Sequence, residues 1–179
     1  MEIKSAQMDV QTTFLRGTIG QAISGMIWLA SAILGTWADE QYAILLLVLA
    51  GMFIFPLTQL TLRLLGRPGG LPKGHPMNQL AVQVAFIVPL SLPVIGAASL
   101  YNINWFYPAF MLIVGVHYMP FTYLYGMWEF ALLSALLIGG GVAFGILVPD
   151  TFFIGGWYTA VVLLLFAIFV QYTPKLSRK

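Results

Sequence analysis

The chain has 179 residues, of which 60% are apolar and only 8% are charged, and its mean hydropathy is +0.90. A water-soluble domain of this length has no room to hide so much apolar surface, so the composition predicts a membrane protein that uses lipid as solvent. The net charge of +2 is small and the basic residues are dispersed between apolar runs, which argues against a nucleic-acid partner.

The segment before Gly17 contains scattered apolar residues among polar ones, and this pattern has two interpretations. It is typical of a short helix lying on the membrane surface. It also fits an extension of the first membrane-spanning helix, and the sequence does not decide between the two.

Six apolar runs follow, each about 20 residues long, which is enough to cross a hydrocarbon layer of about 30 Å as a helix. Their apolar character is continuous instead of alternating, which predicts helices and not strands. We therefore predict an all-α polytopic membrane helical bundle that forms a single integral membrane domain over residues 1–179. The six expected transmembrane helices cover residues 17–37, 41–62, 79–100, 105–125, 129–148 and 153–172.

The basic residues predict the orientation of the bundle. With six spans, all of them fall on one side of the membrane: Lys4, Arg16, Arg63, Arg67, Lys73, Lys175, Arg178 and Lys179. The opposite loops carry the acidic residues Asp39, Glu40 and Asp150. Since basic loops stay in the cytoplasm, both termini are predicted to be cytoplasmic. We expect an integral membrane location, in the bacterial plasma (inner) membrane.

The third and fourth expected spans allow a different arrangement. Pro89 and Pro93 interrupt one and Pro108 and Pro120 the other, and each proline removes a backbone donor and tends to kink its helix. A re-entrant hairpin made of these two spans would leave the orientation unchanged. The connection over residues 101–107 is rich in amphipathic rings and amides that suit a membrane–water interface, so six full crossings are the prediction.

Residues 63–78 form the longest connection, and their many glycines and prolines predict an irregular cytoplasmic loop. The loop is glycine-rich and basic, but it lacks the Gly-Lys-Ser/Thr ending and the preceding strand of a phosphate-binding loop. We expect it to be a solvated connector that touches anionic lipid headgroups.

Small residues mark two helix faces that should pack closely. In the first span this face should look into the bundle, and it consists of Gly17, Gln21, Ser24, Trp28, Ser31 and Gly35. In the fifth span small residues recur every four positions, at Ala131, Ala135, Gly139 and Ala143. The neighbour of the second face is either a helix of the same chain or a second copy, so a homo-oligomer through it is one expectation. A flexible gate at residues 139–141 is the alternative.

Polar side chains gather in the cytoplasmic halves of the expected spans, whereas the outer halves are apolar. They are Gln21, Ser24, Thr58, Gln59, Gln83, His117, Tyr118 and Thr122, with Glu129 at the boundary. An amide or imidazole in hydrocarbon needs a polar partner, so these residues should converge. The sequence therefore predicts a cytoplasm-facing polar cavity, and the residues expected to bind a ligand there are His117, Gln59, Gln83, Gln21, Tyr118 and Glu129.

Two of these residues have competing interpretations. His117 is the residue well within a span that changes charge near neutral pH, so it could relay a proton or bind a ligand. A neutral histidine hydrogen-bonded to Gln59, Gln83 or a carbonyl is the favoured interpretation. Glu129 and Arg16 could pair across helices, but the favoured interpretation is that each side chain extends separately to water.

Motifs for catalysis are absent from the sequence. It contains no His-Glu-x-x-His helix, no Gly-x-Ser-x-Gly turn, no acidic cluster for magnesium and no cysteine, so we expect no enzyme, metal site or cofactor. Proline-broken helices beside a one-sided polar pocket favour a small transporter-like bundle. The scarcity of buried charge points to an apolar or neutral solute as its ligand.

The alternative function is a non-transporting membrane scaffold or regulatory subunit that packs through its small-residue helix faces. A cavity near His117 distinguishes the two, because a scaffold should be tightly packed there. The expected partners are the lipid bilayer and the neutral small molecule.

Overall fold

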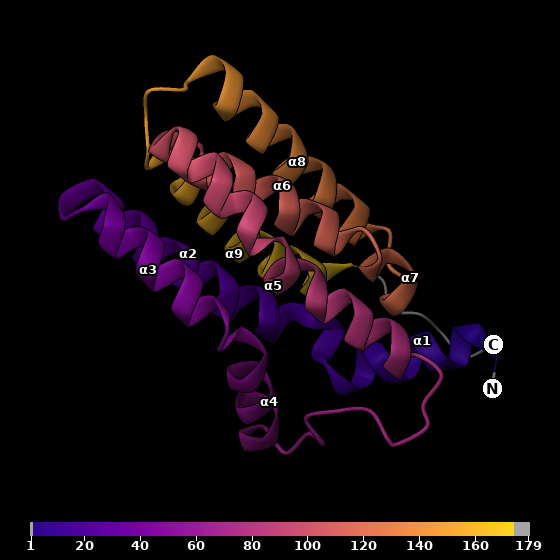
Figure 1. The fold of residues 1–179 in the computed structure, drawn as a ribbon. Coiled ribbons are helices and arrows are strands. Elements are labelled where there is room, and N and C mark those ends of the chain that lie inside the picture. Colours follow the sequence, from indigo (N-terminus) through magenta and orange to yellow (C-terminus); the bar gives the residue numbers. More distant parts are fainter. Residues whose placement is uncertain (1, 174–179) are drawn as a thin grey trace.

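Residues 2–173, which the computed structural model of the chain describes, fold into helices joined by turns and contain no β-strand (Figure 1). Continuous apolar sequence favours this outcome, because a helix satisfies its backbone hydrogen bonds internally. The all-α prediction is confirmed. The basic residues Lys175, Arg178 and Lys179 lie outside the described residues.

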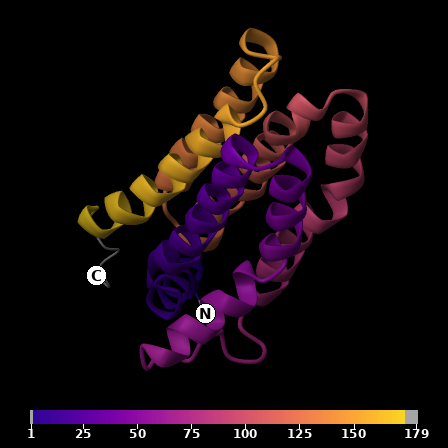
Figure 2. The same cartoon turned by 90° about the vertical axis from the view of Figure 1, so that its left-hand side faces the viewer.

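The long helices run up and down the bundle in turn, with α4 continuing from α3 across a bend (Figures 1 and 2). In chain order they are α1 (Ile3–Thr13), α2 (Thr18–Trp37), α3 (Glu40–Gly51), α4 (Ile54–Leu64), α5 (Asn78–Tyr101), α6 (Phe106–Tyr118), α7 (Phe121–Tyr125), α8 (Glu129–Leu147) and α9 (Ile154–Tyr172), with the single turns η1 (Leu15–Gly17) and η2 (Ile103–Trp105).

Four to five stretches of the described chain are long and apolar enough to cross a membrane. The four are Leu15–Trp37, α5, α8 and α9, and the fifth is the pair α3 and α4, whose axes differ by 53°. The expected span over residues 105–125 is divided between α6, with 13 residues, and the five-residue α7. At about 1.5 Å per residue α6 is about 20 Å long, which is less than a hydrocarbon layer of about 30 Å.

Prolines explain where the expected spans break. The ring of Pro56 would clash with the carbonyl of Met52, four residues earlier, and the chain bends there between α3 and α4. Pro120 likewise stands between α6 and α7. By contrast, α5 continues through both Pro89 and Pro93. The interruption expected in the third span is therefore found in the second span instead.

The basic residues are segregated along the bundle. The helix α1, the end of α4, the loop after it and the end of α9 lie at one end, whereas the α2–α3, α5–α6 and α8–α9 connections lie at the other (Figures 1 and 2). All five basic residues between positions 2 and 173 are therefore at the first end, called here the basic end, and Asp39, Glu40 and Asp150 are at the opposite end. The compartment that each end faces stays a prediction.

The expected inner face of the first span is confirmed in α2. Gln21, Ser24, Trp28 and Ser31 are all buried, and the Ser31 hydroxyl lies 2.6 Å from the Tyr107 hydroxyl of α6. The helix α2 therefore lies at the centre of the bundle, where it packs mainly against α3 and α9.

The small-residue face of α8 does not make the α8 contact with α6. Ala131, Ala135 and Gly139 are exposed, and no atom lies within 4 Å of a Cβ placed on Gly139. The contact runs through the neighbouring face, where a Cβ on Gly141 would lie 2.9 Å from the Pro108 carbonyl oxygen. The Ser134 hydroxyl donates to the Gly115 carbonyl of α6 at 2.7 Å. A homo-oligomer through the exposed face therefore stays a prediction.

Candidate functional site

A cavity of about 300 Å³ lies among α2, α3, α4, α5, α6 and α7. Its residues come mainly from the first halves of α2 and α5 and the second half of α6, which places it toward the basic end of the bundle. Its volume is at the lower end of the range for small-molecule sites, roughly 300 to 1,000 Å³.

The walls of the cavity are mainly apolar. Val88 and Leu92 of α5, Phe110 and Val114 of α6 and Leu47 of α3 all border it, and no described residue that lines it is Asp, Glu, Lys or Arg. The polar cavity expected from the sequence is therefore an apolar cavity with a small polar cluster. Clustering of few polar groups on apolar walls is typical of sites that fix the orientation of a neutral ligand.

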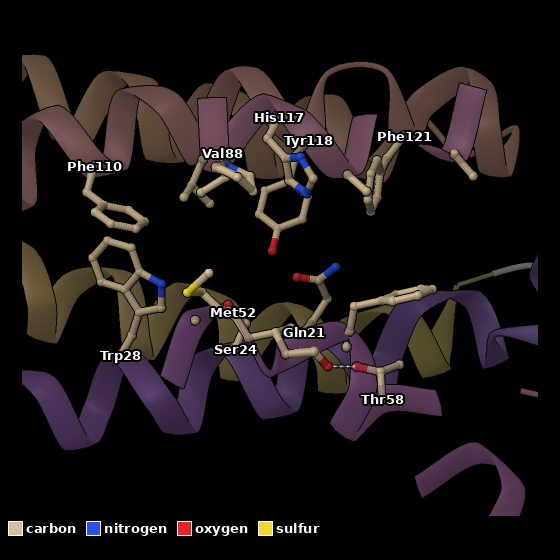
Figure 3. A pocket seen from close by; sticks show the side chains of 18 of the residues that line it. Gln21, Ser24, Trp28, Met52, Thr58, Val88, Phe110, His117, Tyr118 and Phe121 are labelled. Carbon is tan, nitrogen blue, oxygen red and sulfur yellow. Dashed lines mark hydrogen bonds between the residues drawn. The ribbon is translucent and has the colours of Figure 1, made fainter. Parts of the chain in front are cut away.

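The polar cluster joins α2 to α6 (Figure 3). Gln21 and Ser24 come from one side and Tyr118 from the other, with the Tyr118 hydroxyl pointing toward both. Trp28 closes the cavity toward the opposite end, packed edge-to-face on Phe110 at a ring distance of 5.3 Å. Since Gln21, Ser24 and Trp28 are three or four positions apart, one helical face presents all of them.

Gln21 carries an unpaired polar atom. The side chain is only 3% exposed and interacts with the Tyr118 side chain, but its Oε1 has no hydrogen-bond partner among the described residues. A buried acceptor without a donor costs about 1–3 kcal/mol, and buried polar groups are therefore nearly always paired. Because Gln21 lines the cavity, a bound molecule with a donor would satisfy this oxygen.

His117 lies beside the cluster and is fixed by the backbone of α5. Its Nδ1 is 2.9 Å from the Val84 carbonyl oxygen. A carbonyl oxygen can only accept, so Nδ1 carries the hydrogen and Nε2 of the neutral ring is an acceptor. The rings of Tyr118 and Phe121 pack against the imidazole at 5.2 and 5.0 Å. The favoured expectation, a histidine bonded to a carbonyl, is confirmed.

The structure brings together three of the six predicted ligand-binding residues: Gln21, His117 and Tyr118 line the cavity. Gln59 is half-buried on α4 near the glycine-rich loop, Gln83 is exposed on α5, and Glu129 is buried at the start of α8. None of these last three is among the residues that line the cavity. A role for them in binding stays a prediction.

Several lining residues were not among the predicted site residues. The apolar walls carry no sequence signal, because apolar residues in an apolar helix also occur wherever the helix faces lipid. Trp28 and Ser24 did have a signal, since they share the small-residue face of α2 with Gln21.

Arg16 and Glu129 form a buried pair beside the site, so the expectation that each extends separately to water is wrong. The Arg16 guanidinium donates to the carbonyl oxygens of Val170 at 2.6 Å and Thr173 at 2.9 Å, and also to the Thr173 hydroxyl. Its Nη2 lies 3.7 Å from Glu129 Oε1. The last carbonyls of a helix lack partners within the helix, and the guanidinium supplies them at the end of α9.

The N-terminal helix α1 is separate from α2 and packs against protein. Positive φ angles at Leu15, Arg16 and Gly17 turn the chain between the two helices. The amide of Gln7 donates to the Tyr123 carbonyl at 2.6 Å and that of Gln11 to the Tyr125 carbonyl at 2.7 Å, which fixes α1 on α7. The helix α1 is therefore not an extension of the first span, and its position on the membrane surface stays a prediction.

The loop after α4 also contacts α1. His75 Nε2 lies 3.6 Å from Asp9 Oδ2, and His75 Nδ1 accepts from the Met77 amide at 3.2 Å. Phe14 and Tyr125, which flank the docked α1, border the cavity. The basic end of the cavity is therefore built from α1, α7 and their connections. Within residues 2–173 no three His, Asp or Glu side chains gather as a metal site.

A different border of the cavity lies between α4 and α5. Here Met52 and Phe55 on one side are 63% and 56% exposed, and Ala85 and Pro89 on the other side are also exposed. The helix α5 packs chiefly on α6 and η2, so helix packing does not seal the gap between α5 and α4. This border, called here the lateral mouth, consists of apolar side chains.

Residues 3–173 match a family described as "Family of unknown function (DUF7010)", and the chain therefore belongs to this family. Comparisons with curated proteins and with solved structures give no match. The family description names no activity.

Proposed function

We propose that this family member is an integral membrane protein that binds a neutral, mainly apolar molecule between α2, α5 and α6, as a small transporter would. The observation that carries the proposal is the buried, unpaired Oε1 of Gln21 in an otherwise apolar cavity beside His117. A tightly packed scaffold has no use for such an opening. The absence of charged side chains among the described lining residues favours a neutral ligand.

Two helix breaks support a transporter-like role. Met52, at the bend between α3 and α4, lines the cavity, and so do Tyr118 and Phe121, which flank the break between α6 and α7. Interrupted helices at a binding site are a recurring feature of carriers, because the breaks free backbone groups and allow segments to move.

The same proposal includes six membrane crossings with both termini in the cytoplasm. In it α3 with α4 makes the second crossing, and α6 with α7 makes the fourth. An even number of crossings agrees with the position of the five described basic residues at one end of the bundle. The cavity would then lie nearer the cytoplasmic face.

Trp28 provides a direct binding assay, because it lines the cavity. The variant for this assay keeps Trp28 and replaces the other four tryptophans by phenylalanine, at Trp37, Trp105, Trp128 and Trp157. In lipid nanodiscs we expect tribromoethanol, a small neutral quencher, to reduce Trp28 fluorescence in a saturable way.

The matched control keeps Trp157 as the single tryptophan. Its indole nitrogen donates to Thr36 at 2.9 Å, and it does not line the cavity, so its quenching should rise without saturation. Equal, unsaturated quenching of both tryptophans would show that the cavity binds no such molecule.

Alternating access tests transport itself. The chain contains no cysteine, so a single Ser24→Cys substitution places one thiol in the cavity. A carrier should expose this thiol to a membrane-impermeant maleimide from either side of sealed vesicles. Labelling from one side only, or from neither, would contradict transport of a water-soluble solute between the two compartments.

The scaffold is the second candidate, and the exposed small-residue face of α8 favours it. The open surface at Gly139 gives a second helix room to approach closely. Unsaturated quenching of Trp28, combined with self-association that a bulky Gly139→Leu substitution abolishes, would support the scaffold over the transporter.

A further inference from the structure

We propose that the molecule bound in the cavity is a neutral lipid with a hydroxyl head and a hydrocarbon chain, and that it enters sideways from the bilayer through the lateral mouth. This inference rests on the proposed function, which it makes specific. It assigns Gln21 as the acceptor of the hydroxyl hydrogen and the lateral mouth as the position of the chain.

The hydroxyl head of the proposed lipid is inferred from the unpaired oxygen of Gln21. A bound molecule that donates a hydrogen would satisfy this buried acceptor, whereas a pure hydrocarbon would add no bond to it. An ammonium group would also donate, but no described lining residue is a carboxylate that would balance its charge. A hydroxyl group both donates and accepts, so it also suits the hydroxyls of Ser24 and Tyr118 beside Gln21 (Figure 3).

The hydrocarbon chain of the ligand is inferred from the apolar walls of the cavity. Beyond the polar cluster the cavity is bordered by aliphatic and aromatic side chains of α3, α5 and α6, which offer no further hydrogen bonds to a polar molecule. A sugar or other polyol would lose its hydration there without replacement. A ligand with one polar group at the polar cluster and a hydrocarbon chain along the apolar walls therefore fits the lining residues.

The route by which the lipid enters the cavity is inferred from the two borders of the cavity. At the basic end, α1 is held on α7 by the side-chain amides of Gln7 and Gln11, next to the bordering residue Tyr125. At the lateral mouth, Met52 and Phe55 expose apolar side chains at the level of the candidate spans. An apolar opening of this kind suits lipid as the surrounding solvent and does not suit water.

The test again uses Trp28 as the single tryptophan in nanodiscs, with two quenchers that differ only in the head: dibrominated undecanol and dibrominated undecane. We expect the alcohol to quench Trp28 at a mole fraction about tenfold lower than the hydrocarbon, because one buried hydrogen bond changes affinity by about that factor. Replacing the acceptor with an apolar side chain of similar shape, Gln21→Met, should bring the two quenchers within about twofold of each other.

Gln41→Met is the matched control, since Gln41 is an exposed glutamine on α3 outside the cavity, and the preference for the alcohol should persist in it. The comparison of the two quenchers in the unsubstituted cavity needs no folded Gln21 variant. Equal quenching by alcohol and hydrocarbon there would overturn the inference while leaving binding of neutral molecules intact.

Saturable quenching by tribromoethanol at a mole fraction equal to or below that of the undecanol would also overturn it, in favour of a water-soluble solute. Failure of all three quenchers to saturate would instead refute the proposed function itself, and the inference with it.

Discussion

Two alanine substitutions in α8 test which face of this helix packs in the bundle. Gly141 and Gly139 are two positions apart in one helix, so Gly141→Ala and Gly139→Ala change the same helix propensity, by about 1 kcal/mol in favour of alanine. Their surroundings differ. A Cβ on Gly141 would lie 2.9 Å from the backbone oxygen of Pro108, whereas a Cβ on Gly139 would meet no atom within 4 Å.

The expected magnitude follows from these distances. A backbone oxygen cannot move aside as the end of a flexible side chain can, so Gly141→Ala should force α6 and α8 apart at a cost of about 1–3 kcal/mol. After the gain in propensity, Gly141→Ala should be neutral to destabilising by about 2 kcal/mol. Gly139→Ala should stabilise by up to about 1 kcal/mol. The difference between the two variants is therefore about 1–3 kcal/mol and reports packing alone.

Reversible unfolding in mixed micelles of increasing dodecyl sulfate fraction, followed by far-ultraviolet circular dichroism, measures both free energies of unfolding. Equal values for the two variants, or a larger loss for Gly139→Ala, would refute the described α6–α8 contact. A loss for Gly139→Ala that grows with protein concentration would place Gly139 in a contact between copies.

Three further outcomes are expected. Arg16→Met should lower the free energy of unfolding in the same assay by about 3–5 kcal/mol. The loss should be larger than for Glu129→Gln, because Arg16 also donates to the carbonyls at the end of α9. Similar losses for the two variants would contradict that role of Arg16. Ala85→Phe should narrow the lateral mouth and slow quenching of Trp28 by dibrominated undecanol in stopped-flow measurements, and an unchanged rate would place the entry elsewhere. In sealed vesicles of known orientation, Pro72→Cys should be labelled from the cytoplasmic side and Ala38→Cys from the outer side, whereas labelling from the same side would exclude the proposed topology.

Composition was enough to predict a helical membrane bundle, but not where its helices break. Pro56 and Pro120 coincide with breaks, whereas Pro89 and Pro93 lie within the continuous helix α5. A proline always removes one hydrogen bond, but whether the helix bends depends on how neighbouring helices and the released carbonyls are accommodated. That information is in the tertiary contacts, and a single sequence does not contain it.

Half of the ligand-binding residues predicted from the depth of polar side chains line the cavity. They are Gln21, His117 and Tyr118, three polar residues at similar depth on α2 and α6. Gln83 lies at the same depth but is exposed and does not line the cavity, although the carbonyl of its neighbour Val84 is hydrogen-bonded to His117. One residue along a helix corresponds to about 100° of rotation, and in an all-apolar helix the hydrophobic pattern does not fix that rotation.

The α8 face was ambiguous for a related reason. In lipid, the side of a helix that packs and the side that meets acyl chains are both apolar, and small residues stand on both. Gly141 and Gly145, four positions apart on the adjacent face, resemble the predicted small-residue face of Gly139, and the approach of Pro108 to Gly141 shows which face packs on α6. The pairing of Arg16 with Glu129 was considered but not favoured, because the other acceptors of Arg16, at the end of α9, are far away in the sequence.

The bond from Arg16 to Val170 joins residues 154 positions apart and links the beginning of the chain to its last helix. During synthesis the N-terminal part emerges first, so this guanidinium waits at the membrane surface until nearly every later helix has been inserted. The Arg16 contacts therefore form only after α9 has been made. A nascent chain that stops before α9 leaves Arg16 without these acceptors, and a quality-control protease at the membrane would have a basis for distinguishing it from the finished protein.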